Sequence, residues 1–488
     1  MKKVEAIVGV IAVIALILSI VSLGYLSTLS GLYGLSGEIS QLSDRISDLE
    51  DALSDLESRL SEVEKQLGIM TQKPLLSGYE LRVGICLPLS GAMAAFGQSG
   101  LRGAELATDE INWAGGILGA HIKLYIEDFA GDPKVAVSAT EKLITVNKVH
   151  VVRGYFTSSG AMSAVPIAES YKCPVLSIGS SAKELCQKGW KYWFKTPPNS
   201  TMFAKVSVEF LKSEIVPKLN LGRPLKVAVL HENTLMGVSD KNEFLATVNA
   251  SGVNWEIVAV KDYTAGSLDF KPVLEAIKAA GPDVLAMSGY LTDSVLIAKQ
   301  SKEVGLNPLF ISIGGAGMQT PALIDLAGED VAYWFVANEY WWDRAYPSRE
   351  AGRRVAEAFM DRYGVPPDFQ GWSGYAGQYM LKELYEKLAE TQSTALKNAF
   401  KDDKVEVIRN MTRDGLATLK LYLDWTGELY FEPNGQMAYS LTGPSMGCTI
   451  IQVQPATPDD LWSTKGYTFR TVFSSVYKVA DPIIPPRT

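Results

Sequence analysis

Two predicted strands of this chain each run directly into serine residues. Residues 149–156, VHVVRGYF, precede Ser158 and Ser159, and residues 173–179, CPVLSIG, precede Ser181. The first turn of a helix that follows a strand offers unpaired backbone N–H groups and a partial positive charge. Two such turns side by side, each carrying hydroxyls, would form a cradle for a carboxylate or another small polar group.

The alternative interpretation is that each serine only caps the helix that it begins. Ser181 and Glu184, for example, have the S-x-x-E spacing of a capping box, in which the helix backbone uses both side chains. Capping would suffice to explain one isolated serine. The repetition of the pattern at successive strand ends favours a ligand site.

The elements that must position these serines alternate between strand and helix. Residues 81–89 form an apolar run of strand length, residues 97–115 have helical spacing, and further short apolar runs follow, most of them separated by segments of helix length. This alternation predicts an α/β fold with two doubly wound lobes built on parallel sheets. Ligands of such sheets bind at the carboxyl ends of the strands, where the serines stand.

The composition argues against several classes of function. About 410 residues follow residue 78, which suits two lobes rather than one small core. Residues 38–67 hold nine acidic and three basic residues and so carry most of the formal charge of −8, and no basic patch with interleaved aromatics predicts nucleic-acid binding. The three histidines are scattered, and no HExxH, GxSxG or GxxxxGK[ST] motif is present. We therefore expect no enzyme, no cofactor and no metal site.

The cysteines and the glycosylation sequons leave alternatives open. The four cysteines, which show neither CxxC pairs nor metal-ligand spacing, are Cys86, Cys173, Cys186 and Cys448. Outside the cell, Cys173 and Cys186 either form a disulfide or remain buried free thiols. Three N-x-S/T sequons, which are compatible with a glycoprotein, begin at Asn199, Asn249 and Asn410.

The N-terminal segment has the character of a membrane anchor. Residues 6–26 carry no charge and would span about 31 Å as a helix, close to the roughly 30 Å of a hydrocarbon core. Lys2 and Lys3 favour a cytoplasmic N-terminus. We expect a single-pass protein of the cell membrane with the bulk of the chain on the extracytoplasmic side. The alternatives are a cleaved secretory signal and an archaeal type of pilin-like leader that is trimmed before the apolar stretch.

The next segment repeats large apolar residues at steps of three and four. The heptad a positions are Ile39, Ile46, Leu53, Leu60 and Leu67, and the d positions are Leu42, Leu49, Leu56 and Val63. Arg45 and Arg59 stand at g and Glu50 and Glu64 at the following e, which places opposite charges across a parallel interface. We expect residues 32–70 to form a parallel coiled-coil homo-oligomer of undetermined strand number. The alternative is a single amphipathic helix packed on the globular part.

Several motifs together resemble the leucine/isoleucine/valine-type binding proteins of ABC importers. They are residues 88–119, the following EDFAGDP, the segments GYFTSSGAM and LSIGSSAKEL, and the later TGELYFEPNGQM. The resemblance runs from about residue 79 into the 440s. It implies a type I periplasmic binding protein fold, in which two lobes joined by three chain crossings close on a small molecule. It also implies that separate ABC permease and ATPase subunits receive this ligand, which would be an amino acid, an amide or an organic acid.

The resemblance implies which residues would hold the ligand. In the family, hydroxyls and backbone amides at the strand ends of the first lobe bind the ligand's carboxylate. The matching positions are Ser158, Gly179 and Ser181, with Ser159 and Ser180 beside them. Phe96 matches an aromatic residue that lines the pocket, and Tyr290 matches a tyrosine of the second lobe that closes over the ligand.

One position departs from the family pattern. Amino-acid binders of this family carry an acidic residue after the strand that matches PLFISIG, where it meets the ligand's ammonium group, but this chain has Gly314 there. A buried ammonium without a carboxylate partner is costly. Either another acid serves, with Glu339 as one candidate, or the ligand is an amide, a short carboxylic acid or an aromatic acid. The aromatic residues of 333–343 either line a pocket for a ring or pack at the hinge.

Together these observations predict five parts of the chain. They are a membrane anchor at 1–30, a coiled-coil stalk at 31–70, a linker at 71–79, a first lobe at 80–197 with 338–438, and a second lobe at 198–337 with 439–488. The predicted function is that of a membrane-anchored solute receptor. The alternative is a ligand sensor or an envelope scaffold that uses the same fold without transport, although a scaffold would not need the serines.

Overall fold

The computed structural model describes residues 73–314, 317–338, 349–423, 427–439, 448–457, 460, 462–473 and 480–485, with scattered positions between 45 and 59. The residues from Pro74 onward form one compact unit. The predicted anchor at 1–30 lies outside the described residues, as does most of the predicted stalk at 31–70, whose few described positions are helical. Within the described part of the chain, no helix combines the length and the apolar character needed to span a bilayer.

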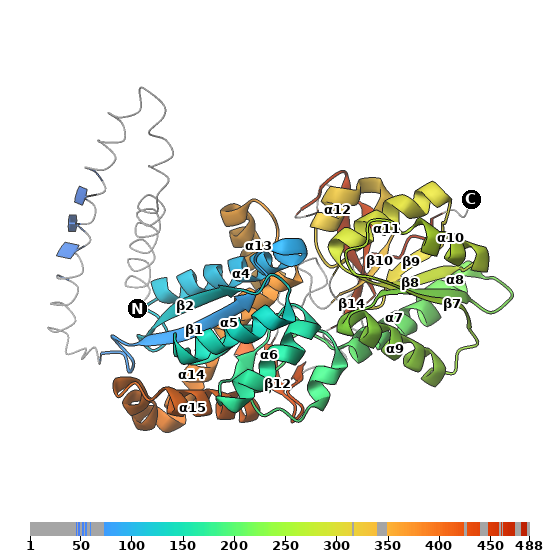
Figure 1. Cartoon of the computed structure of the whole chain (residues 1–488). Coiled ribbons are helices and arrows are strands. Elements are labelled where there is room, and N and C mark those ends of the chain that lie inside the picture. The colour runs from blue at the N-terminus through green and yellow to red at the C-terminus, as the bar shows by residue number, and fades with distance from the viewer. Residues whose placement is uncertain are drawn as a thin grey trace. The chain divides into compact units, whose positions relative to one another are not determined.

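The first of two large sheets has five parallel strands, and we call it, with its helices, lobe 1 (Figure 1). In spatial order the strands are β2 (His121–Asp128), β1 (Glu80–Leu87), β3 (Val151–Gly154), β4 (Val175–Leu176) and β5 (Trp193–Phe194). Side chains alternate between the two faces of a strand. Leu81, Val83 and Ile85 of β1 accordingly join one apolar cluster, and Cys86 joins another.

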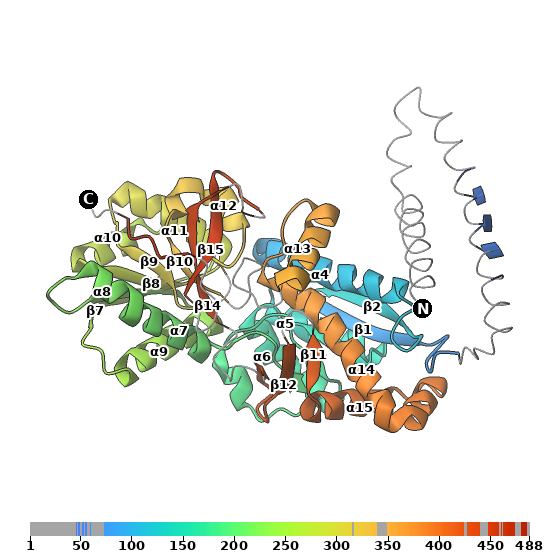
Figure 2. The same ribbon diagram turned by 180° about the vertical axis from the view of Figure 1, so that it is seen from behind.

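Helices cover both faces of this sheet, as buried parallel strands require. The face with Val83 and Ile85 packs against α4 (Ala94–Trp113) and α14 (Phe369–Lys401), which also pack on each other. The opposite face packs against α5 (Pro133–Thr145) and α6 (Ser158–Ser170). Figure 2 shows α14 lying over the sheet on the side away from α5 and α6.

The second sheet has seven strands, and we call it, with its helices, lobe 2. In spatial order they are β15 (Tyr467–Phe473), β14 (Thr449–Pro455), β10 (Phe335–Asn338), β9 (Leu309–Ser312), β8 (Val284–Ser288), β6 (Lys226–Glu232) and β7 (Glu256–Tyr263). The strands from β10 to β7 are parallel, whereas β14 and β15 pair antiparallel at one edge. One face packs on α7 (Ser200–Phe210) and α9 (Leu235–Ala250), and the other on α10 (Lys271–Ala280) and α11 (Leu291–Val304). The predicted α/β fold with parallel sheets is thus confirmed, with two antiparallel strands in addition.

Smaller elements complete the compact unit. A three-stranded antiparallel sheet consists of β11 (Leu421–Leu423), β12 (Gly427–Phe431) and β13 (Met437–Tyr439). The remaining helices are α8 (Val216–Leu219), α12 (Ala322–Ala327), α13 (Arg349–Tyr363) and α15 (Val405–Thr418). Short 3₁₀ turns lie at η1 (Gly91–Met93), η2 (Lys183–Gln187) and η4 (Gly328–Val331), and one π-helical turn at η3 (Leu211–Ile215).

The segment where the chain leaves β5 for α7 is tied to the turn before β13. The backbone N–H of Lys195 donates to the carbonyl oxygen of Gly435 at 2.7 Å, and that of Met437 donates to the carbonyl oxygen of Lys195 at 2.9 Å. The buried ammonium group of Lys195 also donates to the carbonyl oxygens of Pro197 and Pro198, at 2.5 and 2.7 Å. These bonds fix the segment between β5 and α7 against the turn before β13, near the junction of the lobes.

The cysteines and sequons are placed clearly. All four cysteines are buried free thiols, so the disulfide alternative for Cys173 and Cys186 is not what the structure has. The side chain of Asn199 caps α7, and the side chain of Asn410 accepts a hydrogen bond from a tyrosine hydroxyl. Asn249 is exposed, so among the three sequons it has the accessible side chain.

Candidate ligand-binding site

The loops that follow β3 and β4 lie against each other, as the serine pattern predicted. The backbone N–H of Gly179 donates to the carbonyl oxygen of Tyr155 at 3.1 Å, and that of Ser180 donates to the carbonyl oxygen of Phe156 at 2.9 Å. A β-carbon on Gly179 would lie 2.9 Å from the Cα and the carbonyl oxygen of Phe156. Glycine is therefore needed for the two loops to approach this closely.

The hydroxyls on these loops have different roles. Thr157, not Ser158, caps α6, since its Oγ1 accepts a hydrogen bond from the backbone N–H of Gly160 at 3.2 Å. The Ser158 hydroxyl instead accepts from the backbone N–H of Ala182 at 3.2 Å and so joins the two loops. Ser180 has a positive φ of 75° and donates to the carbonyl oxygen of Tyr155 at 2.8 Å, which makes its hydroxyl a structural tie. Ser159 is half-buried beside them.

The capping-box interpretation of Ser181 and Glu184 is wrong. The segment after Ser181 is a short 3₁₀ turn whose cap position is Ala182, with no side-chain cap hydrogen bond. A single 3₁₀ turn does not present the N3 N–H geometry that a capping box requires. The Ser181 hydroxyl is buried, 7% exposed, and no described residue accepts from it or donates to it. It is therefore free to bind a guest molecule.

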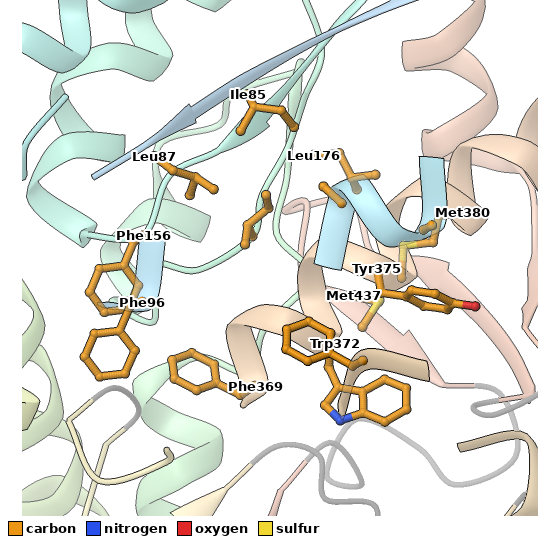
Figure 3. Close-up of a cluster of buried hydrophobic side chains, with 14 of the residues drawn as sticks. Ile85, Leu87, Phe96, Phe156, Leu176, Phe369, Trp372, Tyr375, Met380 and Met437 are labelled. Atoms are coloured by element: carbon orange, nitrogen blue, oxygen red, sulfur yellow. The ribbon is translucent and has the colours of Figure 1, made fainter. Parts of the chain in front are cut away.

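Aromatic side chains lie next to these loops, and Figure 3 shows three of them, Phe96, Phe156 and Phe369. Phe96 stacks on Phe156 with ring centroids 4.8 Å apart, and Phe369 lies 6.1 Å from Phe96 and 6.5 Å from Phe156. Tyr290, which precedes α11 in lobe 2, lies 6.1 Å from Phe156 of lobe 1. The structure thus brings Phe96 and Tyr290, both predicted site residues, to one apolar cluster to which both lobes contribute. We call Phe96, Phe156, Phe369 and Tyr290 the aromatic cluster.

Gly314 lies at the carboxyl end of β9, and its missing side chain makes room for an acid from another element. A β-carbon on Gly314 would lie 1.7 Å from Oδ2 of Asp240, which is on α9. Asp240 is fully buried, and its Oδ2 accepts a hydrogen bond from the Ser288 hydroxyl at 2.7 Å. No described residue donates a hydrogen bond to its Oδ1. Burial raises the pKa of Asp240 to about 7, although the nearby hydroxyls of Ser200 and Ser288 lower it.

Two further acids lie at the same edge of lobe 2. Glu232 accepts hydrogen bonds from the Thr234 hydroxyl at 2.8 Å and from the backbone N–H of Gly237 at 2.6 Å. Asp293 accepts from the backbone N–H of Gly266 at 3.0 Å, and burial raises its pKa to about 6. Burial, helped by Glu232, also raises the pKa of the Tyr290 hydroxyl, which therefore stays neutral at any physiological pH. The acidic residues at this edge thus come from β6, α9 and α11 rather than from the loop at Gly314.

Polar contacts join the two lobes beside the site. The ammonium group of Lys183, on η2, pairs with the carboxylate of Glu243, on α9. The backbone N–H of Lys183 donates to the Ser239 hydroxyl at 3.3 Å, and Thr201 donates to the other oxygen of Glu243 at 2.6 Å. The backbone N–H of Ser200, at the start of α7, donates to the carbonyl oxygen of Ser181 at 2.9 Å. The residues that follow β3 and β4, 155–159 and 177–182, which we call the serine loops, thus touch lobe 2 in this structure.

Sequence reasoning missed two polar residues of this region, Asp240 and Gln370. Gln370 is fully buried, and neither atom of its side-chain amide has a hydrogen-bond partner among the described residues. Its Nε2 would lie 3.0 Å from a β-carbon on Gly179, so it faces the serine loops. From the sequence alone, a polar residue in a helix is expected to face solvent, and Asp240 and Gln370 both lie in helices. Only the apolar residues around Gln370, FQGWSGY, hint that its helix is buried.

The aromatic run at 333–343 is described only as far as residue 338, and Glu339 lies outside the described residues. Trp334 stacks on Phe310 with ring centroids 4.4 Å apart, and the ring centroids of Phe335 and Phe210 are 4.9 Å apart. These two aromatic side chains therefore pack in lobe 2. Among the residues that the structure describes, no group of three or more His, Cys, Asp or Glu side chains is arranged to hold a metal ion.

Two α/β lobes with hydroxyl-bearing loops at their junction define a class of two-lobed binding proteins. Residues 80–432 match the family model described as periplasmic binding protein, and the chain belongs to that family. It is 30% identical over 334 residues to the Leu/Ile/Val-binding protein homolog 7 of Brucella abortus, covering 67% of this chain and 82% of the relative. A Leu/Ile/Val-binding protein homolog 8 of the same organism is 29% identical over 59% of this chain and 71% of its own length. The resemblance to Leu/Ile/Val-type binding proteins is thus confirmed.

Solved structures share the fold. The branched-chain amino acid transporter substrate binding protein LivJ from Streptococcus pneumoniae, in complex with isoleucine, superposes with a TM-score of 0.64 at 20% identity, covering 81% of this chain and 99% of LivJ. A solute binding protein of an ABC transporter from Rhodopseudomonas palustris, in complex with 3,4-dihydroxy benzoic acid, has a TM-score of 0.66 at 18% identity, covering 83% of this chain and 99% of that protein. These likenesses establish the type I periplasmic binding protein fold.

Proposed function

We propose that this protein is the solute receptor of an ABC importer and that it captures a small carboxylate-bearing or amide-bearing molecule between its two lobes. The observation that carries the proposal is the Ser181 hydroxyl, which is buried at the junction of the lobes and has no partner among the described residues. A buried hydroxyl without a partner costs free energy, which a hydrogen bond to a ligand would recover. Ser158, whose hydroxyl accepts from Ala182 and still has its own proton to donate, stands beside it.

The residues expected to hold the ligand form two groups. On lobe 1 the serine loops supply hydroxyls and backbone groups, through Ser158, Ser159, Gly179, Ser180 and Ser181. The aromatic cluster lies next to them and suits the apolar part of a ligand. The ligand classes to test follow from the similar proteins. Relatives are named for leucine, isoleucine and valine, and solved structures contain isoleucine or a hydroxybenzoic acid.

The finer parts of the proposal rest on the sequence. Residues 6–26 would anchor the protein in the cell membrane, residues 32–70 would join several copies as a parallel coiled coil, and the two lobes would stand on the extracytoplasmic side. Permease and ATPase subunits would be separate proteins, since no phosphate-binding loop is present in the sequence. We propose a binding role rather than an enzymatic one.

The test is a ligand screen on the full chain in detergent micelles. Isothermal titration with the twenty L-amino acids, their amides and a panel of aliphatic and aromatic carboxylic acids should find at least one ligand with micromolar affinity. Ser181→Ala should lower the affinity for that ligand about tenfold, because one hydrogen bond to a charged group is lost. An absence of binding across all three classes would favour a scaffold. An unchanged affinity in the Ser181→Ala variant would rule out the proposed site.

A further inference from the structure

We propose that Asp240 is the carboxylate that receives the ligand's amino group, in place of the acid that the chain lacks at Gly314. This inference rests on the proposed receptor function and narrows its substrates to molecules that carry a primary ammonium group beside a carboxylate. It takes up the first of the two alternatives drawn from the sequence, that another acid serves, with Asp240 rather than Glu339 in that role.

The first support is that Asp240 occupies the space in which a side chain at position 314 would stand. Oδ2 of Asp240 lies where a side chain at 314 would begin, 1.7 Å from the position of its β-carbon. The backbone of Gly314 does not have the left-handed φ that only glycine tolerates, so its conformation would accept another residue. What forbids a side chain at 314 is therefore Asp240 itself. A carboxylate carried by α9 therefore stands beside the position at which the resemblance places an acid in the loop after β9.

The second support is that one oxygen of this carboxylate is unused. Asp240 is 0% exposed, Oδ2 accepts from the Ser288 hydroxyl at 2.7 Å, and Oδ1 has no hydrogen-bond donor among the described residues. A buried carboxylate is normally paired with a cation or with several donors. In the structure without ligand, burial raises the pKa of Asp240 to about 7, as expected for a buried acid that has no cationic partner. An arriving ammonium would restore its charge.

The third support is the position of Asp240 relative to the serine loops. Ser200 connects the two sides, since its hydroxyl donates to the carbonyl oxygen of Ser181 at 3.3 Å and also lies close enough to Asp240 to lower its pKa. The Ser181 hydroxyl on lobe 1 and Oδ1 of Asp240 on lobe 2 are both buried and both without partners among the described residues. A hydroxyl suits the carboxylate of an α-amino acid, and the Asp240 carboxylate suits its ammonium group.

Three other acids of lobe 2 near the site are less suited to this role. Glu232 already accepts from the hydroxyl of Thr234 and the backbone N–H of Gly237. Glu243 is paired with Lys183 and Thr201. Asp293 also has one oxygen without a described hydrogen-bond donor, but it packs beside Tyr263, whose pKa it raises, and accepts from the backbone of Gly266. Asp293 is therefore the sharpest control.

The test uses isothermal titration of the full chain in detergent at pH 8 with each L-amino acid and its desamino carboxylic acid, for example leucine with 4-methylpentanoic acid. We expect the amino acid to bind and Asp240→Asn to weaken it at least about 30-fold, as the loss of a buried charge partner does. The desamino acid should change less than threefold in the same variant. Asp293→Asn should leave the amino acid within threefold.

A carboxylate exchange adds a gain of function. Gly314→Asp alone should lose binding because its β-carbon meets Asp240. The double variant Asp240→Ala/Gly314→Asp, which returns the acid to the loop, should recover at least tenfold over Asp240→Ala. If desamino acids bind as well as amino acids and Asp240→Asn has no effect, the role of Asp240 is overturned while the receptor function stands. If Asp293→Asn causes the loss instead, the assignment to Asp240 is wrong. If no probe binds at all, both proposals fall.

Discussion

The ammonium group of Lys183 on lobe 1 is paired with the carboxylate of Glu243 on lobe 2, and Thr201 holds the second oxygen of that carboxylate at 2.6 Å. The Lys183 side chain is 31% exposed and that of Glu243 8%, so the pair is partly shielded from water. An ion pair that bridges two lobes stabilises only the conformation in which the lobes touch. In the proposed receptor it would thus act on the equilibrium between open and closed forms rather than on the fold of either lobe.

Lys183→Met should weaken ligand binding about three- to tenfold, because a partly exposed ion pair contributes on the order of 1 kcal/mol to the closed form. The loss should fall mainly on the dissociation rate, which stopped-flow tryptophan fluorescence can measure. The unfolding temperature without ligand should change little. Lys302→Met is the matched control, since Lys302 forms exposed ion pairs with Glu329 and Asp330 within lobe 2. Equal effects of the two variants would contradict a role of Lys183 in closure.

Ser158 and Ser181 should separate binding from stability. Ser158→Ala removes the acceptor of the Ala182 N–H and should cost about 1 kcal/mol of stability as well as affinity. Ser181→Ala removes a buried hydroxyl that has no described partner, so it should weaken the ligand without lowering the unfolding temperature. Thermal unfolding and titration of both variants with one common ligand provide the comparison. A large loss of stability in Ser181→Ala would mean that its hydroxyl serves the fold.

The sequence predicted the fold and the lobe 1 side of the site because both depend on local patterns. Apolar runs of strand length alternating with helices indicate parallel sheets, and residues that directly follow neighbouring strands must meet at one sheet edge. The sequence pattern could therefore place Ser158 and Ser181 together, and the family resemblance added Gly179. The capping box at Ser181 failed because S-x-x-E spacing presupposes an α-helix, and only five residues of 3₁₀ turn follow.

The lobe 2 side of the site depends on contacts that no local pattern reveals. Asp240 meets Gly314 across 74 residues of chain, and this contact exists only because α9, which packs on β6 and β8, also reaches the residues after β9. Phe369 joins Phe96 and Phe156 from a helix that begins 273 residues after Phe96. From the sequence alone, Gly314 indicates that the expected acid is missing. Only the structure shows that Asp240 lies beside Gly314.

Gln370 offers a test of whether the site is built for binding rather than for stability. Its buried amide has no described partner on either atom, so Gln370→Met, which is similar in size, should stabilise the protein without ligand by about 1 kcal/mol. It should also change the preference among ligands, because the amide faces Gly179 and the serine loops. Gln378→Met is the matched control on the same helix, since the Gln378 amide donates to the Thr108 hydroxyl at 2.9 Å and its loss should destabilise. Destabilisation of both variants would show that Gln370 has a structural partner.

The surroundings of Asp240 determine how stability responds to pH. The groups that face it are the hydroxyls of Ser200 and Ser288, which lower its pKa, and the carboxylates of Glu232 and Glu184, which raise it. Burial is the largest cause and raises the pKa from 3.8 to about 7. The folded protein therefore holds a proton that the unfolded chain has released above pH 4. This contribution to stability is fully present below about pH 4 and is lost as the pH rises through 7.

Asp240→Asn should therefore stabilise the protein without ligand, and the gain should grow from near zero at pH 4 to about 4 kcal/mol at pH 8, since each pKa unit corresponds to about 1.4 kcal/mol. Urea unfolding of the full chain followed by tryptophan fluorescence measures it, because all ten tryptophans lie beyond residue 112 and report on the two lobes. Asp262→Asn, at an exposed position of β7, should show no such growth with pH. A gain from Asp240→Asn that is equal at both pH values would mean that Asp240 is not a buried acid held near neutrality. A gain that grows as expected, together with lost amino-acid binding, would mean that the protein gives up stability to keep a carboxylate for its ligand.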